Sequence, residues 1–234
     1  MILNENESGA DSRFFCDVKT YVVRIGRMTD SQKKNYEELS PVWCIPYAPE
    51  KLSYASIFGN ANPVTVEIGF GMGAATAEIA AQNPGRNYIG IEVHKPGVGK
   101  LLGEIKARGL ENLRVIEHDA VEVLGNMIAD ESVCAFHVFF PDPWPKKRHH
   151  KRRLVQRPHT DLFAAKLAPG GYFYMVTDWL EYAQSALEEL TATEHLINKY
   201  DGFAEHQEWR PETKFEARGI RDDRPISELY FIKK

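Results

Sequence analysis

Val64–Gly73 has the sequence VTVEIGFGMG, a short β-rich run followed by glycine at every second position. Residues 74–81 then have a helix-forming composition, so this stretch predicts a strand, a glycine-rich turn and a helix. Glycines at such a turn let a ligand approach the backbone, because no side chain stands in the way. The stretch therefore predicts a ligand site at the carboxyl end of a strand.

Strand-like and helix-like segments alternate after this turn. The expected strands are Tyr88–Val93, Leu113–Glu117, Ala135–Phe140 and Tyr172–Thr177, and the expected helices are Pro96–Arg108, Val121–Ile128, Pro158–Leu167 and Glu181–Glu189. Alternation of this kind is typical of a doubly wound α/β fold, in which helices cover both faces of a parallel sheet. The strand before Pro141 is apolar apart from His137, as expected for a strand buried on both faces.

The two ends of the chain depart from this alternation. Before the glycine turn, Asp30 is the expected N-cap of a helix over Ser31–Leu39 that ends before Pro41. After the last helix, Ala204–Trp209 and Glu228–Ile232 are predicted to form an antiparallel hairpin at the sheet edge. Residues 1–30 are expected to form a flexible arm and residues 31–234 a single domain.

The composition narrows the class of protein. The chain has 234 residues, of which 43% are hydrophobic and 26% charged, as is ordinary for a soluble globular protein. It has neither a run of about twenty apolar residues nor an apolar leader, so neither a membrane protein nor a secreted one is expected. The three cysteines, Cys16, Cys44 and Cys134, are far apart and odd in number. They argue against a disulfide framework or a zinc-ligand pair and favour a cytoplasmic location.

Three acidic residues lie at the ends of successive expected strands, namely Glu67, Glu92 and Asp119. Ligands of doubly wound folds bind outside the carboxyl ends of the strands, so these acids are expected to meet Gly69 and Gly71 at one crevice. Glu92 is expected to accept hydrogen bonds from ribose hydroxyls, and Asp119 from an adenine amino group. The set predicts S-adenosylmethionine as the cofactor.

The glycine spacing alone leaves a second cofactor open. Gly69, Gly71 and Ala74 also satisfy the dinucleotide pattern G-x-G-x-x-A, which favours a nicotinamide-dependent oxidoreductase. Glu67 argues against that reading, because its charge would repel a pyrophosphate but not a cationic sulfonium. For each acid, a purely structural role as a helix N-cap or a solvated loop carboxylate is a further alternative.

The fourth expected strand runs into Pro141-Asp142-Pro143-Trp144 and then a strongly basic segment. Two prolines fix the backbone around Asp142, so its carboxylate is expected at the sheet edge. Trp144 offers a flat face on which a base can stack. Six of the eight residues from Lys146 to Arg153 are Lys or Arg, although the net charge of the chain is −4. Positive charge gathered so locally predicts an anionic partner, RNA.

Together these segments resemble one family closely. The segments that carry the resemblance are Glu67–Gly71, Pro141–Trp144 with Lys146 and the basic run, Thr177-Asp178, and Thr213-Lys214-Phe215-Glu216. They are similar to segments of the bacterial tRNA (guanine-N7-)-methyltransferases, and the likeness runs from about Tyr21 to the C-terminus. It implies a Rossmann-like class I methyltransferase fold. The implied reaction moves a methyl group from S-adenosyl-L-methionine to N7 of guanosine 46 in the tRNA variable loop, leaving S-adenosyl-L-homocysteine.

Matched residue by residue, the resemblance implies three sets of site residues. The cofactor set is Glu67, Gly69, Gly71, Glu92, Asp119 and Asp142, and Asp142 is also the catalytic position. The substrate set is Lys146, Asp178, Thr213, Lys214, Phe215 and Glu216. The RNA-contacting set is Arg148, His149, His150, Lys151, Arg152 and Arg153.

The chemistry of guanine N7 sets what such a site must supply. Its lone pair needs no deprotonation before attack, so a strong general base is unnecessary and alignment is the main requirement. Asp142 is expected to accept hydrogen bonds from the guanine N1–H and amino group. Methyl transfer needs no metal and none is predicted; His137 is expected to be a core histidine. The alternatives are a non-catalytic RNA-binding module and a methyltransferase for a protein side chain. A monomer or a weak homodimer is expected.

Overall fold

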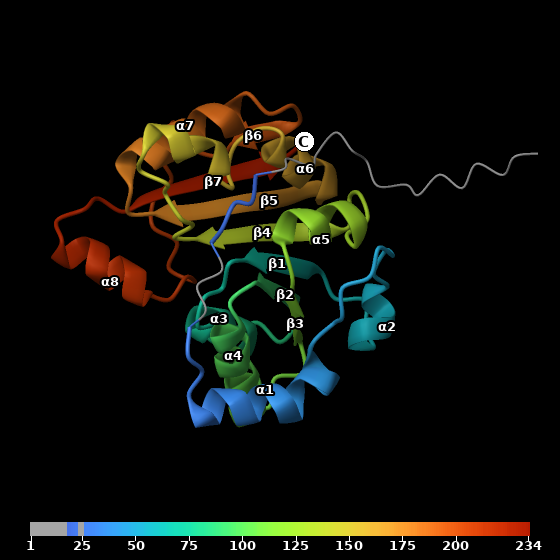
Figure 1. Ribbon diagram of the computed structural model, residues 1–234. Helices are drawn as coiled ribbons and strands as arrows, with labels where there is room; N and C mark the ends of the chain where they lie inside the picture. Colours follow the sequence, from blue (N-terminus) through green and yellow to red (C-terminus); the bar gives the residue numbers. More distant parts are fainter. Residues whose placement is uncertain (1–17, 23–25) are drawn as a thin grey trace, which may run out of the picture.

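The computed structural model describes residues 18–22 and 26–234, which form a seven-stranded sheet with helices on both faces (Figure 1). The strands are β1 (Val64–Ile68), β2 (Asn87–Glu92), β3 (Leu113–Glu117), β4 (Val133–Phe139), β5 (Leu167–Thr177), β6 (Leu196–Asn198) and β7 (Ser227–Lys233). The helices are α1 (Asp30–Trp43), α2 (Tyr54–Phe58), α3 (Ala74–Gln82), α4 (Lys95–Arg108), α5 (Ala120–Asn126), α6 (His159–Lys166), α7 (Leu180–Thr191) and α8 (Lys214–Arg221), and a short 3₁₀ helix covers Lys147–Arg152.

The sheet has the order β3-β2-β1-β4-β5-β7-β6. The five strands from β3 to β5 are parallel, whereas β7 pairs antiparallel with both β5 and β6. Every residue of β1 is buried, as expected for a central parallel strand covered on both faces. The predicted doubly wound α/β sheet with an antiparallel C-terminal edge is therefore confirmed.

The core consists of two apolar clusters, one on each face of the sheet. One cluster brings Val123 of α5, Phe163 of α6 and Tyr182 of α7 against the strands. The other brings Ala77 of α3 and Leu101 of α4 against the opposite face. Helices from both halves of the chain are thus needed to bury the central strands, which is the arrangement that the alternating sequence predicted.

Helix α1 differs from its prediction at both ends. Its N-cap is Thr29 rather than Asp30: the Thr29 hydroxyl accepts a hydrogen bond from the Gln32 amide at 3.2 Å, and the Gln32 side chain accepts one from Thr29 at 2.9 Å. This reciprocal capping box fixes the start of the helix. The expected stop before Pro41 is wrong, since the helix continues through that proline to Trp43.

The C-terminal hairpin uses a different strand from the expected one. Ala204–Trp209 is not a strand; Ala204 forms only an isolated bridge to Glu228, and β6 takes the edge position beside β7 instead. Trp209 instead stacks its ring on the buried His137 ring, with the centroids 4.9 Å apart. The structure also adds α8 between the two expected hairpin segments, where no helix was predicted.

Positions 1–17 and 23–25 of the expected arm lie outside the described residues, so the division into an arm and one domain stays a prediction. Cys16 falls in the same part of the chain, whereas Cys44 and Cys134 are both free thiols. Among the described helices, none combines the length and the apolar character that crossing a bilayer requires.

Candidate active site

The expected cofactor acids and Asp142 lie at or just after the ends of strands that meet at one edge of the sheet. β1 lies between β2 and β4, and the strand order runs outward from it in both directions, so the topological switch point lies between β1 and β4. In that register Glu67 of β1 is opposite His137 of β4. Figure 1 shows the arrowheads of β4 and β5 pointing toward the side where α8 lies. Doubly wound folds bind ligands at such an edge.

The glycine turn after β1 is closed by Glu92. Gly69 and Gly71 have φ values of 75° and 59°, a region that residues with a side chain rarely adopt. The Gly71 amide donates a 2.9 Å hydrogen bond to the Glu92 carboxylate, which also accepts bonds from the next two backbone amides after it. A side chain at Gly97 would place its Cβ 1.9 Å from the Gly71 carbonyl oxygen, so α4 packs directly on the turn.

Glu67 is the most deeply buried of the expected cofactor residues, with 4% of its surface exposed. Burial raises its pKa to about 8; the Thr76 hydroxyl opposes that shift, and the charge of Glu92 adds to it. A cationic group bound beside Glu67 would favour its charged form.

Asp119 has two structural partners. Its carboxylate is the N-cap of α5, accepting a hydrogen bond from the Val121 amide at 2.9 Å. The Lys19 ammonium contacts the same carboxylate at 2.9 Å and Glu122 at 2.6 Å. The structural role considered for this acid is therefore real, while the expected contact with adenine stays a prediction.

The reaction segment, Phe140–Trp144, leaves β4 in a constrained conformation. Phe140 and Trp144 have φ values of 50° and 46°, and both carry bulky side chains for which this region is unfavourable. The Phe140 amide still donates to the Val176 carbonyl of β5 at 2.7 Å, which anchors the start of the segment. Asp142, between its two prolines, is exposed. Strained backbone of this kind persists where the surrounding structure enforces it, and it gathers at functional sites.

The Trp144 ring, expected to stack on a base, is already engaged by the protein. The guanidinium of Arg152 lies 4.2 Å from the ring centroid, and the indole N–H donates to the Thr20 carbonyl at 3.1 Å. Arg152 in turn donates to the carbonyls of Lys19 and Tyr21. Trp144 and Arg152 thus bind residues 19–21 through backbone carbonyls. The Arg152 guanidinium covers one face of the Trp144 ring.

The basic run forms the 3₁₀ helix and divides into exposed and buried members. Lys146, Lys147, Arg148 and Lys151 are exposed, and His149 and His150 are partly so. Arg153 is only 2% exposed and pairs with Glu181 of α7. Because its guanidinium is committed inside the protein, we remove Arg153 from the expected RNA-contacting set.

The expected substrate segment Thr213–Glu216 forms the start of α8. The Thr213 hydroxyl accepts a hydrogen bond from the Glu216 amide at 3.1 Å, and the Glu216 carboxylate turns back to the Thr213 amide. Lys214 and Phe215 point outward and are exposed, whereas Glu216 is buried against Arg210. Only Lys214 and Phe215 of this segment are therefore exposed.

Asp178 and the reaction segment both contact the α8 region. Arg224, in the loop after α8, pairs with the Asp178 carboxylate at 2.7 Å. The ring of Phe215 stacks on that of Phe140, with centroids 6.1 Å apart and planes inclined by 21°. The structure thus brings the expected substrate residues to the same edge as Asp142.

A family model described as a putative methyltransferase matches residues 61–229. The tRNA (guanine-N(7)-)-methyltransferase of Francisella tularensis subsp. novicida is 51% identical over 217 residues, covering 92% of this chain and 95% of that protein. The protein of the same name from Chromobacterium violaceum is 50% identical, with 93% and 96% covered. The one from Treponema pallidum is 47% identical, with 95% and 98% covered.

The chain belongs to the tRNA (guanine-N(7)-)-methyltransferase family. This membership confirms the resemblance seen in the sequence and rules out the nicotinamide-dependent oxidoreductase.

Two solved methyltransferase structures resemble the fold of this chain. The 16S rRNA methyltransferase KamB matches with a TM-score of 0.57 at 17% identity, covering 79% of this chain and 95% of KamB. The aminoglycoside resistance methyltransferase NpmB1 matches with a TM-score of 0.52 at 16% identity, covering 76% and 91%. At such low identities the likeness concerns the fold alone, and it confirms the Rossmann-like methyltransferase architecture.

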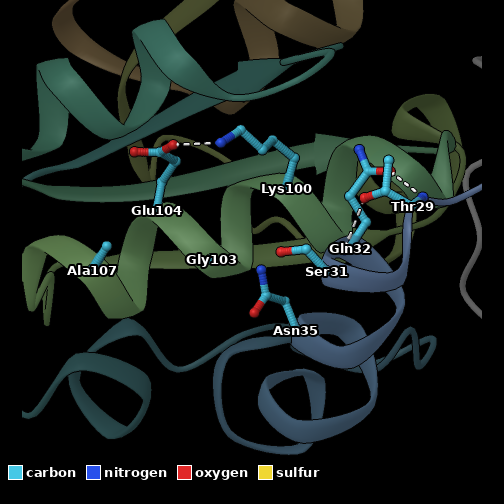
Figure 2. A pocket seen from close by; sticks show the side chains of 8 residues that line it. All are labelled: Thr29, Ser31, Gln32, Asn35, Lys100, Gly103, Glu104 and Ala107. Atoms are coloured by element: carbon cyan, nitrogen blue, oxygen red, sulfur yellow. Dashed lines mark hydrogen bonds and ion pairs between the residues drawn. The ribbon is translucent and has the colours of Figure 1, made fainter.

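A hollow of about 470 Å³ lies between α1 and α4, away from these site residues (Figure 2). It is lined by Thr29, Ser31, Gln32, Asn35, Lys100, Gly103, Glu104 and Ala107. Lys100 and Glu104 form an ion pair at 2.8 Å on its rim. None of the expected cofactor, substrate or RNA residues lines this hollow, so we do not assign it to the active site.

Three residues around the site went unnoticed in the sequence: Lys19, Arg153 as a buried residue, and Arg210. Lys19 and Arg153 pair with acids far away in the chain, Asp119 and Glu181, whereas Arg210 pairs with both Glu216, six residues on, and Glu228. No local spacing rule could have paired them. The capping box of α8 was recognisable, because Thr213 and Glu216 have the spacing that starts a helix. His137, expected to be a satisfied core histidine, is in the core and only half satisfied. It is 2% exposed, burial lowers its pKa to about 3, and its Nε2 bonds to the Tyr172 hydroxyl at 3.0 Å, but its Nδ1 has no partner among the described residues.

Proposed function

We propose that this protein transfers a methyl group from S-adenosyl-L-methionine to N7 of a guanine in tRNA, at position 46 of the variable loop. The observation that carries the proposal is the placement of the reaction segment. This segment follows β4 beside the switch point and carries the exposed Asp142. An exposed basic 3₁₀ helix begins five residues after Asp142. The printed names of relatives that align with almost the whole chain support the same reaction.

The groups at the ends of β1, β2 and β3 fit S-adenosylmethionine. Its bound form would supply an electrophilic methyl group on a positively charged sulfur. Glu67 offers a buried carboxyl beside the turn, where a cation stabilises its charged form. Gly69 and Gly71 leave the turn open to close approach. Glu92 would accept hydrogen bonds from the ribose, and Asp119 from the adenine. Lys19, which contacts the Asp119 carboxylate, must then either share that carboxylate with the adenine or give up the contact.

Asp142 is proposed to orient the target base rather than remove a proton. Guanine N7 is neutral and presents its lone pair in the plane of the ring, so the reaction depends on alignment and exclusion of water. A carboxylate at position 142 can accept bonds from the N1–H and amino groups of guanine. It also favours the positive charge that develops on the base. Pro141 and Pro143 restrict the backbone on either side of Asp142.

The exposed cations of the 3₁₀ helix are proposed to contact tRNA phosphates. Lys146, Lys147, Arg148 and Lys151 lie immediately after the reaction segment. Phosphate contacts position RNA without reading its sequence, so these residues would hold the variable loop over Asp142. Since tRNA is the proposed substrate, we place the activity in the cytoplasm.

The proposal is tested by supplying labelled S-adenosylmethionine with three substrates in parallel: unmodified tRNA transcript, ribosomal RNA and mixed protein. Label entering tRNA alone is the expected result. Label entering protein would favour the rival protein methyltransferase. No label in any substrate, with S-adenosylhomocysteine still bound, would favour the non-catalytic RNA-binding module.

A further inference from the structure

Arg210 is a fully buried cation that joins three elements of the protein. It lies in the turn before α8, and none of its side chain is exposed. Its guanidinium donates to the Glu216 carboxylate of α8 at 2.7 Å, to Glu228 of β7 at 2.8 Å and to the Tyr174 hydroxyl of β5 at 3.2 Å. Such a network is stabilising only when all its members are satisfied.

The same cluster has donors that resemble a metal site. One ligand atom from each of His206, Glu216 and Glu228 lies within 4.8 Å of the other two. Arg210 supplies the positive charge in their midst, since it contacts both carboxylates and approaches His206 Nδ1 to 3.2 Å. Burial alone would raise the pKa of Glu216, but the contact with Arg210 holds it below its usual range. The cluster is therefore an internal ion network.

The network fixes where α8 begins. Glu216 both pairs with Arg210 and completes the capping box with Thr213, so one carboxylate joins the start of the helix to the sheet. Further along, Gly219 packs so closely that a Cβ there would lie 2.9 Å from the Asp178 Cβ. Phe215 then stacks on Phe140 of the reaction segment. Movement of Glu216 would displace all of these contacts.

We propose that Arg210 is a positioning residue for methyl transfer. It acts through Glu216 to hold Thr213, Lys214 and Phe215 against the reaction segment. This inference rests on the proposed function, in which those residues meet the substrate. It assigns Glu216 to the anchor of α8 rather than to recognition of guanine.

The test compares Arg210→Lys, Arg210→Met and Glu216→Gln with wild type in steady-state tRNA methylation. Lysine keeps the charge but lacks the planar fork that reaches both carboxylates. We expect the KM for tRNA to rise at least tenfold in each variant, while the Kd for S-adenosylhomocysteine changes less than twofold. In the double variant that carries Arg210→Lys and Glu216→Gln, the rise in KM for tRNA should be much smaller than the product of the two single-variant rises. The reason is that both substitutions disturb the same contact.

Lys166→Met is the matched control for lost stability. Lys166 is also a largely buried cation paired with a carboxylate, that of Asp130, and it lies at the opposite end of β5 from Thr177. The Lys166→Met substitution should lower the Tm without changing the KM for tRNA. Unchanged kinetics in both Arg210 variants, or multiplicative effects of Arg210→Lys and Glu216→Gln, would overturn the inference. So would an equal rise in KM for Lys166→Met.

Hydrogen exchange separates this inference from the proposed function. In the RNA-free protein, Arg210→Met should speed amide exchange in residues 213–221 while leaving exchange in β1 and β4 unchanged. If wild type methylated no tRNA but this local loosening occurred, the proposed function would fail and the anchoring role of Arg210 would stand. Unaltered exchange in residues 213–221 would refute the anchor whatever the activity.

Discussion

The Nε of Arg153 donates a 3.0 Å hydrogen bond to the carbonyl of Pro143, the residue that follows Asp142. The same guanidinium pairs with Glu181 of α7, at 3.1 Å for Nη1, and lies over the ring of Tyr182. A buried member of the basic run therefore ties the reaction segment to the helix layer. The exposed members of the run remain available to RNA.

Arg153→Met should loosen the reaction segment. The variant loses charge-assisted hydrogen bonds to Glu181 and the bond to Pro143, and Glu181, which is half exposed, becomes solvated. We expect unfolding in urea to cost about 1.5–3 kcal/mol less than for wild type. We also expect kcat to fall more than tRNA affinity, since the displaced group is next to Asp142.

Arg157→Met is the control for this prediction. Arg157 pairs with Glu189 at the surface, where its side chain is 52% exposed. Its loss should cost less than about 1 kcal/mol and leave kcat unchanged. Equal effects of the two substitutions would contradict the special role of Arg153.

Asp142→Asn should lower kcat on the order of 100-fold, because an amide cannot accept both guanine donors or favour the developing charge. The side chain is exposed and, among the described residues, forms no hydrogen bond or ion pair, so the Tm should stay within a degree or two of wild type. Single-turnover methylation with saturating tRNA measures the chemical step. Full turnover with unchanged tRNA affinity would show that Asp142 does not orient the base.

The stability of the ligand-free protein should depend on pH through Glu67. Burial raises its folded-state pKa to about 8 from an ordinary value of 4.5, so between those values the folded state binds more protons than the unfolded state. Its contribution is therefore complete below about pH 4.5 and is lost as the pH rises to about 8. Relative to Glu67→Gln, wild type should lose unfolding free energy across this range and then level off.

Urea midpoints measured for both proteins from pH 5 to pH 9 check this sign. A difference between wild type and Glu67→Gln that stays constant with pH would mean that Glu67 titrates normally in the folded protein.

Lys147→Ala should weaken tRNA binding and reduce its salt dependence. If Lys147 neutralises one phosphate, the slope of log affinity against log salt should fall by roughly 0.7–0.9. Lys33→Ala on α1 is the control, since Lys33 is a well exposed lysine (68%) outside the basic run. Filter binding of tRNA at several salt concentrations distinguishes the two variants. Equal slopes of log affinity against log salt for Lys147→Ala and Lys33→Ala would show that the RNA does not contact Lys147.

The parallel half of the fold was predictable because its signals are local. Val64–Gly73 carries a strand and its turn within ten residues, and β3 falls on the predicted residues, Leu113–Glu117. The end of the chain was less predictable, because Trp209 packs on His137 from β4 instead of continuing a strand. Periodicity cannot report a partner that lies far away in the sequence.

The candidate site shows the same division. Glu67, Glu92 and Asp142 were located by their positions at or just after the ends of predicted strands. The burial of Arg153 was not predicted, since within a run of cations only its distant partner Glu181 distinguishes it from its neighbours. Trp144 was expected to present a flat face to a base. In the structure Arg152 covers one side of its ring, and no local feature of the sequence indicates this contact.

The central claim is methyl transfer to guanine N7 at position 46 of tRNA. It is tested most directly by methylating an unmodified tRNA transcript with the purified protein and mapping N7-methylguanosine by reduction and chain cleavage. We expect a single cleavage at position 46 and no methyl incorporation into a transcript with adenosine at that position. Cleavage at another guanosine, or equal incorporation into the substituted transcript, would contradict it.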